Sequence, residues 1–513
     1  MPDTRRSLPL SALLPALPGV QVVGPPLDGL AISGLAYDSR RVRPGDLFVA
    51  LPGLHVDGMR FVPAAIDRGA VAVLCQQEPL QEQETHVPHL VVPDARAAMA
   101  DAAAAYFGHP SDRLHLVGVT GTDGKTTTGF LLHALLQGTG RPAGLIGTVG
   151  FRVGDRAIEN QLHQTTPESP DVQELLAAMV EADLEYAVLE TSSHALMLDR
   201  VRGCRFDSAI LTNITSDHLD FHGTLENYRA AKARLFAGLG GDPPRAVAPI
   251  AILNRDDASY DAMAAASAAP VLSYGRHPDA DVRATDVVIG ASGIRFRAVT
   301  PAGVVELHSP LTGDFNVSNL LAALGFAVAR SIPLDAAGRA LGSLGGVPGR
   351  MQRVEAGQPF AVVIDFAHTP DALAKALDTL RAVTPPPGRL IAVFGAPGER
   401  DRGKRPVMGR VAAERCDLVV LADDDPRGED RHAIIEQIAA GARAAGLREG
   451  RTLLLRPDRR DAIATAIGAA RPGDTVLLAG KGHEQSITSG DVVQVWDEES
   501  AARAAIAALK GEQ

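Results

Sequence analysis

Residues 117–128, VGVTGTDGKTTT, are those whose types and spacing most clearly suggest a reaction. They combine a β-branched apolar run, two closely spaced glycines, and a lysine followed by hydroxyl side chains. Glycines let the backbone turn tightly and aim its N–H groups at an anion, and a following helix adds the positive end of its dipole. Lys125 would place a charge between terminal phosphates, while the hydroxyl of Thr126 or Thr127 would reach a magnesium ion. The stretch therefore predicts a loop that binds the polyphosphate of ATP.

The match to the general phosphate-loop pattern is incomplete. That pattern has a glycine five positions before Gly124, where this chain has Val119, and Gly118 misses the place by one residue. The alternative interpretation is a glycine turn between a strand and a helix that binds nothing, although a GKT triplet directly after a hydrophobic strand is uncommon by accident. By itself the loop predicts only a nucleotide-hydrolysing or kinase-like protein.

Acidic and imidazole side chains follow two further apolar runs. Glu190 ends the run EYAVLE and is followed by hydroxyls and His194. An acid at the carboxyl end of a strand can hold the magnesium that the phosphate loop also contacts. Downstream, the segment LTNITSDHLDFHG, residues 211–223, gathers Asp217, His218, Asp220 and His222. One of those imidazoles could serve a second magnesium, and the alternative for any single residue is a helix cap or a surface turn.

Lys232 lies in the helical pattern ENYRAAKARLF, residues 226–236. A lone lysine at such a position normally extends into solvent along the surface of its helix. Its spacing alone therefore predicts a solvated surface residue.

Three polar loops follow apolar runs in the last third of the chain. They are GAPGERDRGKR (395–405), DDDPR (423–427) and GKGHE (480–484). Because the carboxyl ends of parallel strands share one edge of a sheet, we expect Arg400, Arg427 and Glu484 to converge there. Two guanidinium groups and a carboxylate suit a zwitterionic amino acid, whose carboxylate arginine can bind with two hydrogen bonds.

Short apolar runs alternate with helical patterns from about residue 114 onward, which predicts an α/β fold with parallel sheets. The expected strands are 46–51, 70–74, 89–92, 114–119, 361–365 and 390–394, and the expected helices are 95–106, 129–136, 226–236 and 371–382. Residues 7–20 are expected to form a short capped helix and a turn. The polar turn HPSDR (109–113) and the glycine-rich segment GSLGGVPGR (342–350) are the expected domain boundaries.

Composition restricts the partners. The 513 residues suggest about three domains, and a formal net charge of −11 without any long Lys/Arg run argues against a nucleic-acid-binding protein. The three cysteines are far apart and form no CxxC pair, so neither a disulfide framework nor a zinc site is indicated. No apolar run approaches the roughly 18 residues that would span a bilayer, and three prolines interrupt the signal-peptide-like N-terminus. We therefore expect a cytoplasmic protein without membrane insertion.

With these residues identified, the chain resembles the Mur ligase family, and within it the branch that adds the third residue of the peptidoglycan precursor peptide. The resemblance covers nearly the whole chain. It depends on YDSRRVRPGDLFVALPG (37–53), GTDGKTT (121–127), GDFNVSNLLAA (313–323), DFAHTPDAL (365–373), DDDPR (423–427) and GKGHE (480–484).

The resemblance implies three α/β domains. These are a small N-terminal domain for the UDP-N-acetylmuramoyl group (residues 1–110), a central P-loop, parallel-sheet ATPase domain (111–345), and a C-terminal Rossmann-like domain for the amino acid (346–513). It also implies the reaction, in which ATP and Mg²⁺ drive the joining of a diamino acid to UDP-N-acetylmuramoyl-L-alanyl-D-glutamate through an acyl phosphate, by a monomeric enzyme.

Site residues follow from the same resemblance. Those implied at ATP are Gly121, Thr122, Asp123, Gly124, Lys125, Thr126, Thr127, Asn316, Arg350, Asp365 and His368. Those implied at the UDP-muramoyl dipeptide are Tyr37, Ser39, Leu54, His55, Val56, Thr165, Thr166, Ser192 and Arg200. Those implied at the amino acid are Arg400, Asp424, Asp425, Pro426, Arg427, Gly480 and Glu484. The implied catalytic residues are Lys125, Lys232, Glu190 and His218, and the implied metal ligands are Thr126, Glu190, His218 and Lys232 as a carbamate.

Three positions depart from the family pattern. Asp123 replaces the usual asparagine of the ATP loop, and Leu198 stands where a glutamine often contacts substrate. Asp425 gives DDDPR where the diaminopimelate-type members usually have DNPR. Arg427 favours meso-diaminopimelate, because its guanidinium can pair with the distal carboxylate, whereas Asp425 could neutralise Arg427 and admit L-lysine or L-ornithine.

Other functions remain open at this point. Folylpolyglutamate synthase shares the ligase plan but lacks a segment like residues 38–48, and DDDPR and GKGHE argue against the sister ligase that adds D-alanyl-D-alanine. A P-loop nucleotide switch would need no amino-acid site.

Overall fold

The structure is a computed structural model that describes residues 5–53, 57–78, 86–154, 156–160, 164–215, 217–240, 247–290 and 293–511. The chain forms two compact units. The first consists of residues 1–285, 298–305 and 318–340, and the second of residues 286–297, 306–317 and 341–513. The domain boundaries expected at 110/111 and 345/346 stay predictions.

A five-stranded sheet begins the first unit, with strand order β2-β7-β6-β5-β4. All its pairings are parallel except that of β2 with β7. Successive side chains of β5 point to opposite faces: Leu47 and Val49 pack toward α2, whereas Phe48 and Ala50 pack toward α1. The elements are β1 (Leu8–Pro9), η1 (Leu10–Ala16), β2 (Gln21–Val23), β3 (Ala31–Ile32), β4 (Gly34–Ala36), η2 (Ser39–Arg41), β5 (Asp46–Ala50), η3 (Gly58–Phe61), α1 (Val62–Asp67), β6 (Ala72–Cys75), β7 (His89–Val91) and α2 (Ala95–Phe107).

A second, 11-stranded sheet has the order β11-β10-β9-β12-β8-β13-β14-β15-β16-β17-β18. The strands from β9 to β16 in this order pair in parallel. Its first elements are η4 (Pro110–Asp112), β8 (His115–Thr120), α3 (Lys125–Gly138), β9 (Ala143–Ile146), β10 (Gly150–Val153), β11 (Arg156–Glu159), α4 (Ser169–Glu181), β12 (Tyr186–Glu190), α5 (Ser193–Met197) and β13 (Ser208–Leu211). The remaining elements are α6 (Leu219–His222), α7 (Leu225–Ala237), β14 (Ile250–Asn254), α8 (Tyr260–Ala266), β15 (Val271–Gly275), β16 (Val282–Gly290), β17 (Gly293–Thr300), β18 (Gly303–Ser309), α9 (Phe315–Ala329) and α10 (Leu334–Gly342).

One edge of this sheet differs from the expected all-parallel arrangement. Strand β10 is antiparallel to both β9 and β11. Only two residues connect β10 to β11, and so short a connection permits an antiparallel hairpin and no parallel crossover. The parallel core of the sheet was predictable, and this hairpin was not.

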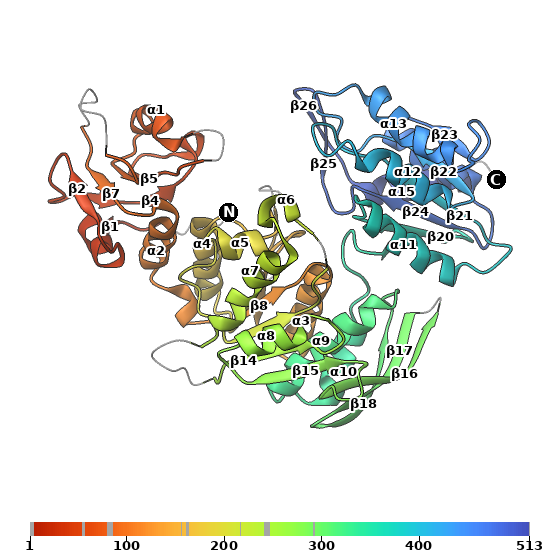
Figure 1. Cartoon of the computed structure of the whole chain (residues 1–513), viewed down its shortest axis with the longest axis horizontal. Coiled ribbons are helices and arrows are strands. Elements are labelled where there is room, and N and C mark those ends of the chain that lie inside the picture. The colour runs from red at the N-terminus through yellow and green to blue at the C-terminus, as the bar shows by residue number, and fades with distance from the viewer. Residues whose placement is uncertain are drawn as a thin grey trace. The chain divides into compact units, whose positions relative to one another are not determined.

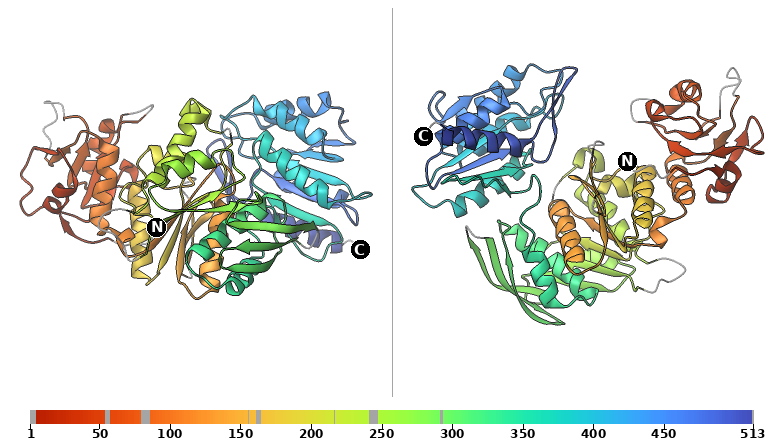
Figure 2. Two further views of the ribbon diagram at one scale, coloured as in Figure 1. Left: turned by 60° about the horizontal axis from the view of Figure 1, so that its bottom comes forward. Right: turned by 180° about the vertical axis from the view of Figure 1, so that it is seen from behind.

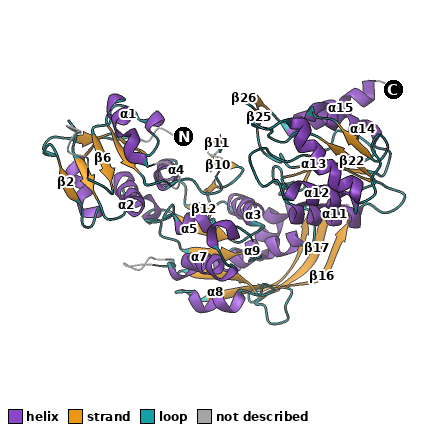
Figure 3. Cartoon of the chain, turned by 45° about the horizontal axis from the view of Figure 1, so that its top comes forward, coloured by secondary structure: helices purple, strands orange, loops and turns teal. Residues whose placement is uncertain are grey.

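The second unit contains a six-stranded sheet of order β19-β20-β24-β21-β22-β23, parallel apart from β19. Helices α11, α12 and α13 pack on one face, and α14 and α15 pack on the other (Figures 1 and 2). Figure 3 shows the same layering, with purple helices around orange strands. The elements are β19 (Gln352–Arg353), β20 (Ala361–Asp365), α11 (Pro370–Val383), β21 (Leu390–Phe394), α12 (Lys404–Ala413), β22 (Leu418–Leu421), α13 (Arg431–Ala444), β23 (Leu453–Leu455), α14 (Arg459–Ala469), β24 (Thr475–Ala479), β25 (Ser486–Ser489), β26 (Val492–Val495) and α15 (Glu498–Gly511).

Most expected elements are present with shifted ends. Residues 361–365 and 390–394 form β20 and β21 as expected, and the strand expected at 114–119 is β8, one residue later. The helix expected at 129–136 begins earlier, at Lys125. The N-terminal segment forms the 3₁₀ helix η1, and its N-cap, Pro9, makes no side-chain cap bond, so the expected capped helix is corrected. Within the described residues, no helix is both long and apolar enough to cross a membrane.

Candidate active site

The loop between β8 and α3 depends on two glycines. A Cβ at Gly121 would lie 1.8 Å from the Thr212 hydroxyl oxygen, so any side chain there would collide with its neighbour. Gly124 has φ +83°, a left-handed conformation, and a Cβ there would lie 2.5 Å from the Asn319 side-chain oxygen. The backbone of this loop therefore requires glycine at both positions.

The two lysines named as catalytic meet at this loop. Lys125 Nζ donates to the carbonyl oxygens of Gly121 and Thr122, at 3.0 and 2.8 Å. Lys232 Nζ donates to the same Gly121 oxygen, at 2.7 Å, and lies 4.4 Å from the centre of the Tyr228 ring. Lys232 is only 1% exposed. The prediction from spacing alone, a solvated surface lysine, is wrong, because α7 packs this face against the phosphate loop.

Burial changes the chemistry of Lys232. Loss of solvent, and secondarily the nearby Lys125 ammonium, hold the pKa of Lys232 well below its usual value. A lysine with a lowered pKa carries an unprotonated amine more often, and the unprotonated amine is the nucleophilic form.

Glu190 forms the polar centre of the first unit's site. It ends β12, its side chain is fully buried, and it accepts hydrogen bonds from Thr126 Oγ1 at 2.9 Å and Thr148 Oγ1 at 3.0 Å. The backbone N–H of Thr148 donates to its other oxygen, at 3.1 Å. The first turn of α3 and the end of β12 are thus joined as expected. Sequence reasoning missed Thr148, and its place after the glycine that directly follows the apolar strand β9 was the available signal.

The other loop residues lie around this centre. Thr127 is buried in the first turn of α3. The Thr122 hydroxyl bonds the Thr215 carbonyl and the Tyr228 hydroxyl, at 3.2 and 3.1 Å. Asp123, the departure from asparagine, has an exposed side chain, and its backbone is held by Asn213 and Thr212.

Three imidazoles gather near the N-terminus of α5. The ring centre of His194 lies 4.8 Å from that of His218 and 5.6 Å from that of His222. His222 Nε2 is 3.0 Å from Ser193 Oγ. Burial, with the neighbouring His218 and His222, lowers the pKa of His194 to about 4, so His194 is neutral at pH 7. The His218 side chain is 48% exposed, and His218 is the N-cap residue of α6, with φ +52°.

The residues expected at the dipeptide lie next to Glu190. Thr166 Oγ1 donates to the Glu190 backbone oxygen at 2.7 Å and accepts from the Ser192 N–H at 3.1 Å. Arg200 donates to the Thr166 carbonyl and pairs with Glu168 at 2.9 Å. Thr165 Oγ1 is 3.2 Å from Thr148 Oγ1. Leu198, the second departure, follows α5 and is half-buried.

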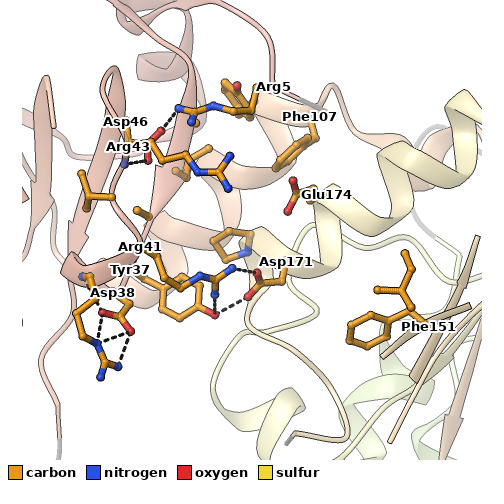
Figure 4. Close-up of a pocket in the computed structure, with 18 of the residues that line it drawn as sticks. Arg5, Tyr37, Asp38, Arg41, Arg43, Asp46, Phe107, Phe151, Asp171 and Glu174 are labelled. Carbon is orange, nitrogen blue, oxygen red and sulfur yellow. Dashed lines mark hydrogen bonds and ion pairs between the residues drawn. The ribbon is translucent and has the colours of Figure 1, made fainter. Parts of the chain in front are cut away.

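A cavity of about 830 Å³ lies beside Tyr37 in the first unit. Figure 4 shows its basic and acidic lining residues, among them Arg5, Arg41, Arg43 and Asp171. The Tyr37 hydroxyl donates to Asp171 at 2.5 Å, and Arg41 pairs with the same carboxylate at 3.2 Å. Ser39 begins η2 nearby. Leu54, His55 and Val56 lie outside the described residues.

The remaining residues that are expected to contact ATP belong to the second unit. The Asn316 side chain donates to the Thr312 carbonyl at 2.7 Å. Asp365 accepts from the backbone N–H groups of Met351 and Ala367, and burial raises its pKa despite the nearby Arg350. His368 Nδ1 lies 2.9 Å from the Phe366 carbonyl oxygen, and burial lowers its pKa.

The loops expected at the amino acid converge in part. Asp424, Asp425 and Glu484 bring carboxylate oxygens within 4.8 Å of one another, and Gly480 lies beside Asp424. Pro426 is buried and Arg427 is half-buried, whereas Arg400 is exposed. Lys481 Nζ, which sequence reasoning did not select, lies among the carboxylates.

A phosphate loop joined to a buried strand-end acid, on a chain with two α/β units, defines a nucleotide-dependent enzyme. The chain matches three described families: "Mur ligase family, catalytic domain" over residues 31–107, "Mur ligase middle domain" over 119–327, and "Mur ligase, glutamate ligase domain" over 349–482. It belongs to the Mur ligase family, whose members are ATP-dependent, ADP-forming ligases.

Individual relatives support this membership. A UDP-N-acetylmuramyl-tripeptide synthetase of Roseiflexus sp. strain RS-1 is 51% identical and covers 93% of this chain and 95% of its own length. A UDP-N-acetylmuramoyl-L-alanyl-D-glutamate–2,6-diaminopimelate ligase of Geobacillus thermodenitrificans strain NG80-2 is 43% identical, covering 97% and 99%. A solved structure of a ligase with the latter name is 32% identical, with a TM-score of 0.67 and coverage of 98% and 100%.

Proposed function

We propose that this chain joins a diamino acid to the D-glutamate of UDP-N-acetylmuramoyl-L-alanyl-D-glutamate, a step of peptidoglycan precursor synthesis. The D-glutamate side-chain carboxylate attacks the γ-phosphate of ATP and releases ADP, which converts the carboxylate into an acyl phosphate. An amine of the diamino acid then displaces inorganic phosphate and forms the amide. The observation that carries this proposal is the buried contact of Thr126 with Glu190 beside Lys125, because it supplies a phosphate loop and an acid in one place.

The protein's part in phosphoryl transfer is positioning and charge. Loop N–H groups and Lys125 would bind the phosphates, since Lys125 donates to the carbonyl oxygens of Gly121 and Thr122 and could exchange them for phosphate oxygens. The Lys125 ammonium would then balance negative charge on the transferring group.

The donor set at Glu190 fits magnesium. Mg²⁺ prefers carboxylate, hydroxyl and water oxygens, and Glu190 lies at hydrogen-bond distance from two hydroxyl groups in a buried place. Thr126, Glu190, His218 and a carbamate of Lys232 are the residues we propose to hold it. When bound, the ion would neutralise charge on the phosphates.

The environment of Lys232 supports its proposed carbamylation. The unprotonated Nζ would attack the carbon of CO₂ and lose a proton, which leaves a carbamate anion. The lowered pKa of Lys232 favours the required unprotonated amine, and the carbamate anion would form an ion pair with the neighbouring Lys125 ammonium. An intact-mass increase that is lost at low pH would test it.

Substrate positions are proposed from the neighbourhood of these groups. Thr165, Thr166, Ser192 and Arg200 would hold the dipeptide. Thr165 bonds Thr148 and Thr166 bonds Glu190, whereas Ser192 and Arg200 both bond Thr166. Tyr37 and Ser39 would contact the uridine end. Asn316, Arg350, Asp365 and His368 would contact the nucleotide, and the loops 395–405, 423–427 and 480–484 would bind the amino acid.

Meso-diaminopimelate is the acceptor we favour, with L-lysine and L-ornithine as the other candidates. The support is Arg427, because binding lysine would leave a guanidinium without its carboxylate, at a cost on the order of 2 to 5 kcal/mol in a dry site. A cytoplasmic, monomeric enzyme fits the proposed use of ATP and a nucleotide-linked substrate.

The Lys125→Ala variant tests the proposed reaction. We expect ADP release with the UDP-muramoyl dipeptide and diamino acid to fall by roughly 100-fold or more, because a charge aimed at the transferring phosphate is lost. The exposed Lys375→Ala variant should keep the wild-type rate. Retention of most activity by Lys125→Ala would contradict the proposed role.

A further inference from the structure

The carboxylates in the loops that follow β22 and β24 are close enough to repel one another strongly. Oxygens of Asp424, Asp425 and Glu484 lie within 4.8 Å of one another, and Asp424 is only 4% exposed. Like charges at such separations oppose ionisation of the group unless a cation lies among them.

Lys481 supplies that cation from the chain itself. Its Nζ lies 2.6 Å from Glu484, 3.1 Å from Asp425 and 3.6 Å from Asp424, and its side chain is fully buried. Burial by itself would lower the pKa of Lys481, but Asp424, Glu484 and Asp425 together raise it above the usual value. The ammonium is therefore charged, and it occupies the place that a bound cation would otherwise take.

Asp425, which stands in place of the usual asparagine, uses its carboxylate to bond Lys481 and the backbone. Its Oδ1 accepts from Lys481 Nζ and from the Thr488 N–H, at 3.1 and 2.9 Å. None of the ion pairs recorded among the described residues joins Asp425 to Arg427. Asp425 therefore does not neutralise Arg427 in the way that its position in the sequence suggested.

Arg427 is held by its backbone. Its N–H donates to the Thr488 carbonyl at 2.9 Å, and its own carbonyl accepts from the Gly490 N–H at 2.6 Å. Its φ of +53° lies in the left-handed region, so these bonds fix an uncommon conformation. The backbone position from which the Arg427 side chain extends is therefore fixed, whatever the charge of Asp425.

We propose that Lys481 is a specificity-determining residue of the amino-acid site, because it offsets the Asp425 and Glu484 carboxylates and so sets the charge offered to the distal end of the diamino acid. This inference rests on the proposed function. With Lys481 present, one carboxylate charge is cancelled and a distal carboxylate can approach Arg427. Without it, the site gains one net negative charge, which favours a distal ammonium and opposes a distal carboxylate. Lys481 acts through its neighbours and contacts no reacting atom.

The test compares acceptors in one enzyme. We would measure kcat/KM for ADP release with meso-diaminopimelate, L-lysine and L-ornithine, for the wild type and for the Lys481→Met, Asp425→Asn and double variants. We expect Lys481→Met to lower the ratio of kcat/KM for diaminopimelate to kcat/KM for lysine about tenfold or more. The reason is that a carboxylate without its cation, at about 4 Å, repels the distal carboxylate of diaminopimelate and attracts the distal ammonium of lysine. Asp425→Asn should raise the ratio, and the double variant should return it most of the way to the wild-type value.

The controls separate charge from damage to the fold. Lys375→Met removes an exposed ammonium paired with Asp371 in the same unit and should leave the ratio unchanged. If Lys481→Met fails to fold, Asp425→Asn still tests the inference, because this variant keeps Lys481 and removes one carboxylate charge from the site. An unchanged or lowered ratio in Asp425→Asn, or an unchanged ratio in a folded Lys481→Met protein, overturns the inference.

Failure of the proposed function would look different. The wild type would then release no ADP with any of the three diamino acids. In that case, calorimetric titration of the same amino acids into the wild type and Asp425→Asn compares their affinities directly. If the difference in affinity between diaminopimelate and lysine changes in Asp425→Asn, the result supports the role of Lys481. If that difference does not change, the result overturns it.

Discussion

Gly147 shows how a single atom can control the candidate site. A Cβ at this position would lie 2.1 Å from the Glu190 carboxylate oxygen, closer than two such atoms can approach. The Glu190 carboxylate can therefore bond Thr126 and Thr148 only because residue 147 has no side chain. The adjacent Thr148 contributes both its hydroxyl and its N–H.

The Gly147→Ala variant should lower ADP release by roughly 10- to 100-fold, because displacement of a positioned group by about 1 Å can cost that much. Glu190 is fully buried and has little room to move aside. Steady-state kinetics would measure the effect, and Gly468→Ala, which adds a methyl group where no atom lies within 4 Å, is the control. A wild-type rate in Gly147→Ala would show that the contact of Glu190 with Thr126 is dispensable.

Helix α3 illustrates the element scale. The sequence predicted a helix from residue 129, whereas α3 begins at Lys125, directly after the left-handed Gly124. The run Thr126 to Thr128 has low helix propensity, which favoured a loop. Burial of all three threonines outweighs that propensity, because α3 packs against β8, β9 and β12.

The middle of α3 contains His133, whose Nε2 is buried without a hydrogen-bond partner among the described residues. Burial, and secondarily Arg152, lower its pKa from 6.5 to about 4. Between pH 4 and 6.5 the unfolded chain therefore binds a proton that the folded chain does not. The contribution of this group to stability is complete above pH 6.5 and is lost as the pH falls toward 4.

The His133→Leu variant should therefore flatten the pH dependence of the free energy of unfolding between pH 6.5 and 4, by about 1 to 3 kcal/mol. Denaturant unfolding at several pH values would measure it. His308→Gln, at an exposed position of β18, should keep the wild-type slope. An identical slope in His133→Leu would mean that His133 is protonated in the folded protein as readily as in the unfolded chain.

At the scale of the whole molecule, the second unit is tied together by a buried ion pair. Arg459 and Glu498 pair at 2.6 Å with 0% and 1% of their side chains exposed. Arg459 also donates to the carbonyl oxygens of Asp423 and Ala479, at 2.9 and 2.8 Å. These carbonyls immediately precede the loops that contain Asp424 and Gly480, so the pair positions both loops.

The Glu498→Gln variant should destabilise the second unit by about 3 to 5 kcal/mol, because it leaves Arg459 charged, buried and without its carboxylate. Scanning calorimetry should show a lower unfolding temperature for the second unit and an unchanged unfolding temperature for the first. Glu436→Gln breaks a surface ion pair with Arg443, and we expect it to change the free energy of unfolding by less than about 1 kcal/mol. Equal effects of the two substitutions would rule out a special role for the buried pair.

The sequence by itself determined the α/β class, the phosphate loop with its required glycines, the acid at the end of β12 and the three polar loops of the second unit. These depend on local chemistry and on the general rule that parallel strands end at one edge of a sheet. Only the tertiary structure decided that Lys232 is buried on the Gly121 carbonyl, that Thr148 bonds Glu190, and that Asp425 turns to Lys481. Each of these depends on neighbours at least 42 residues away in the chain. Burial and pairing with such neighbours, which set pKa and charge, cannot be read from local spacing.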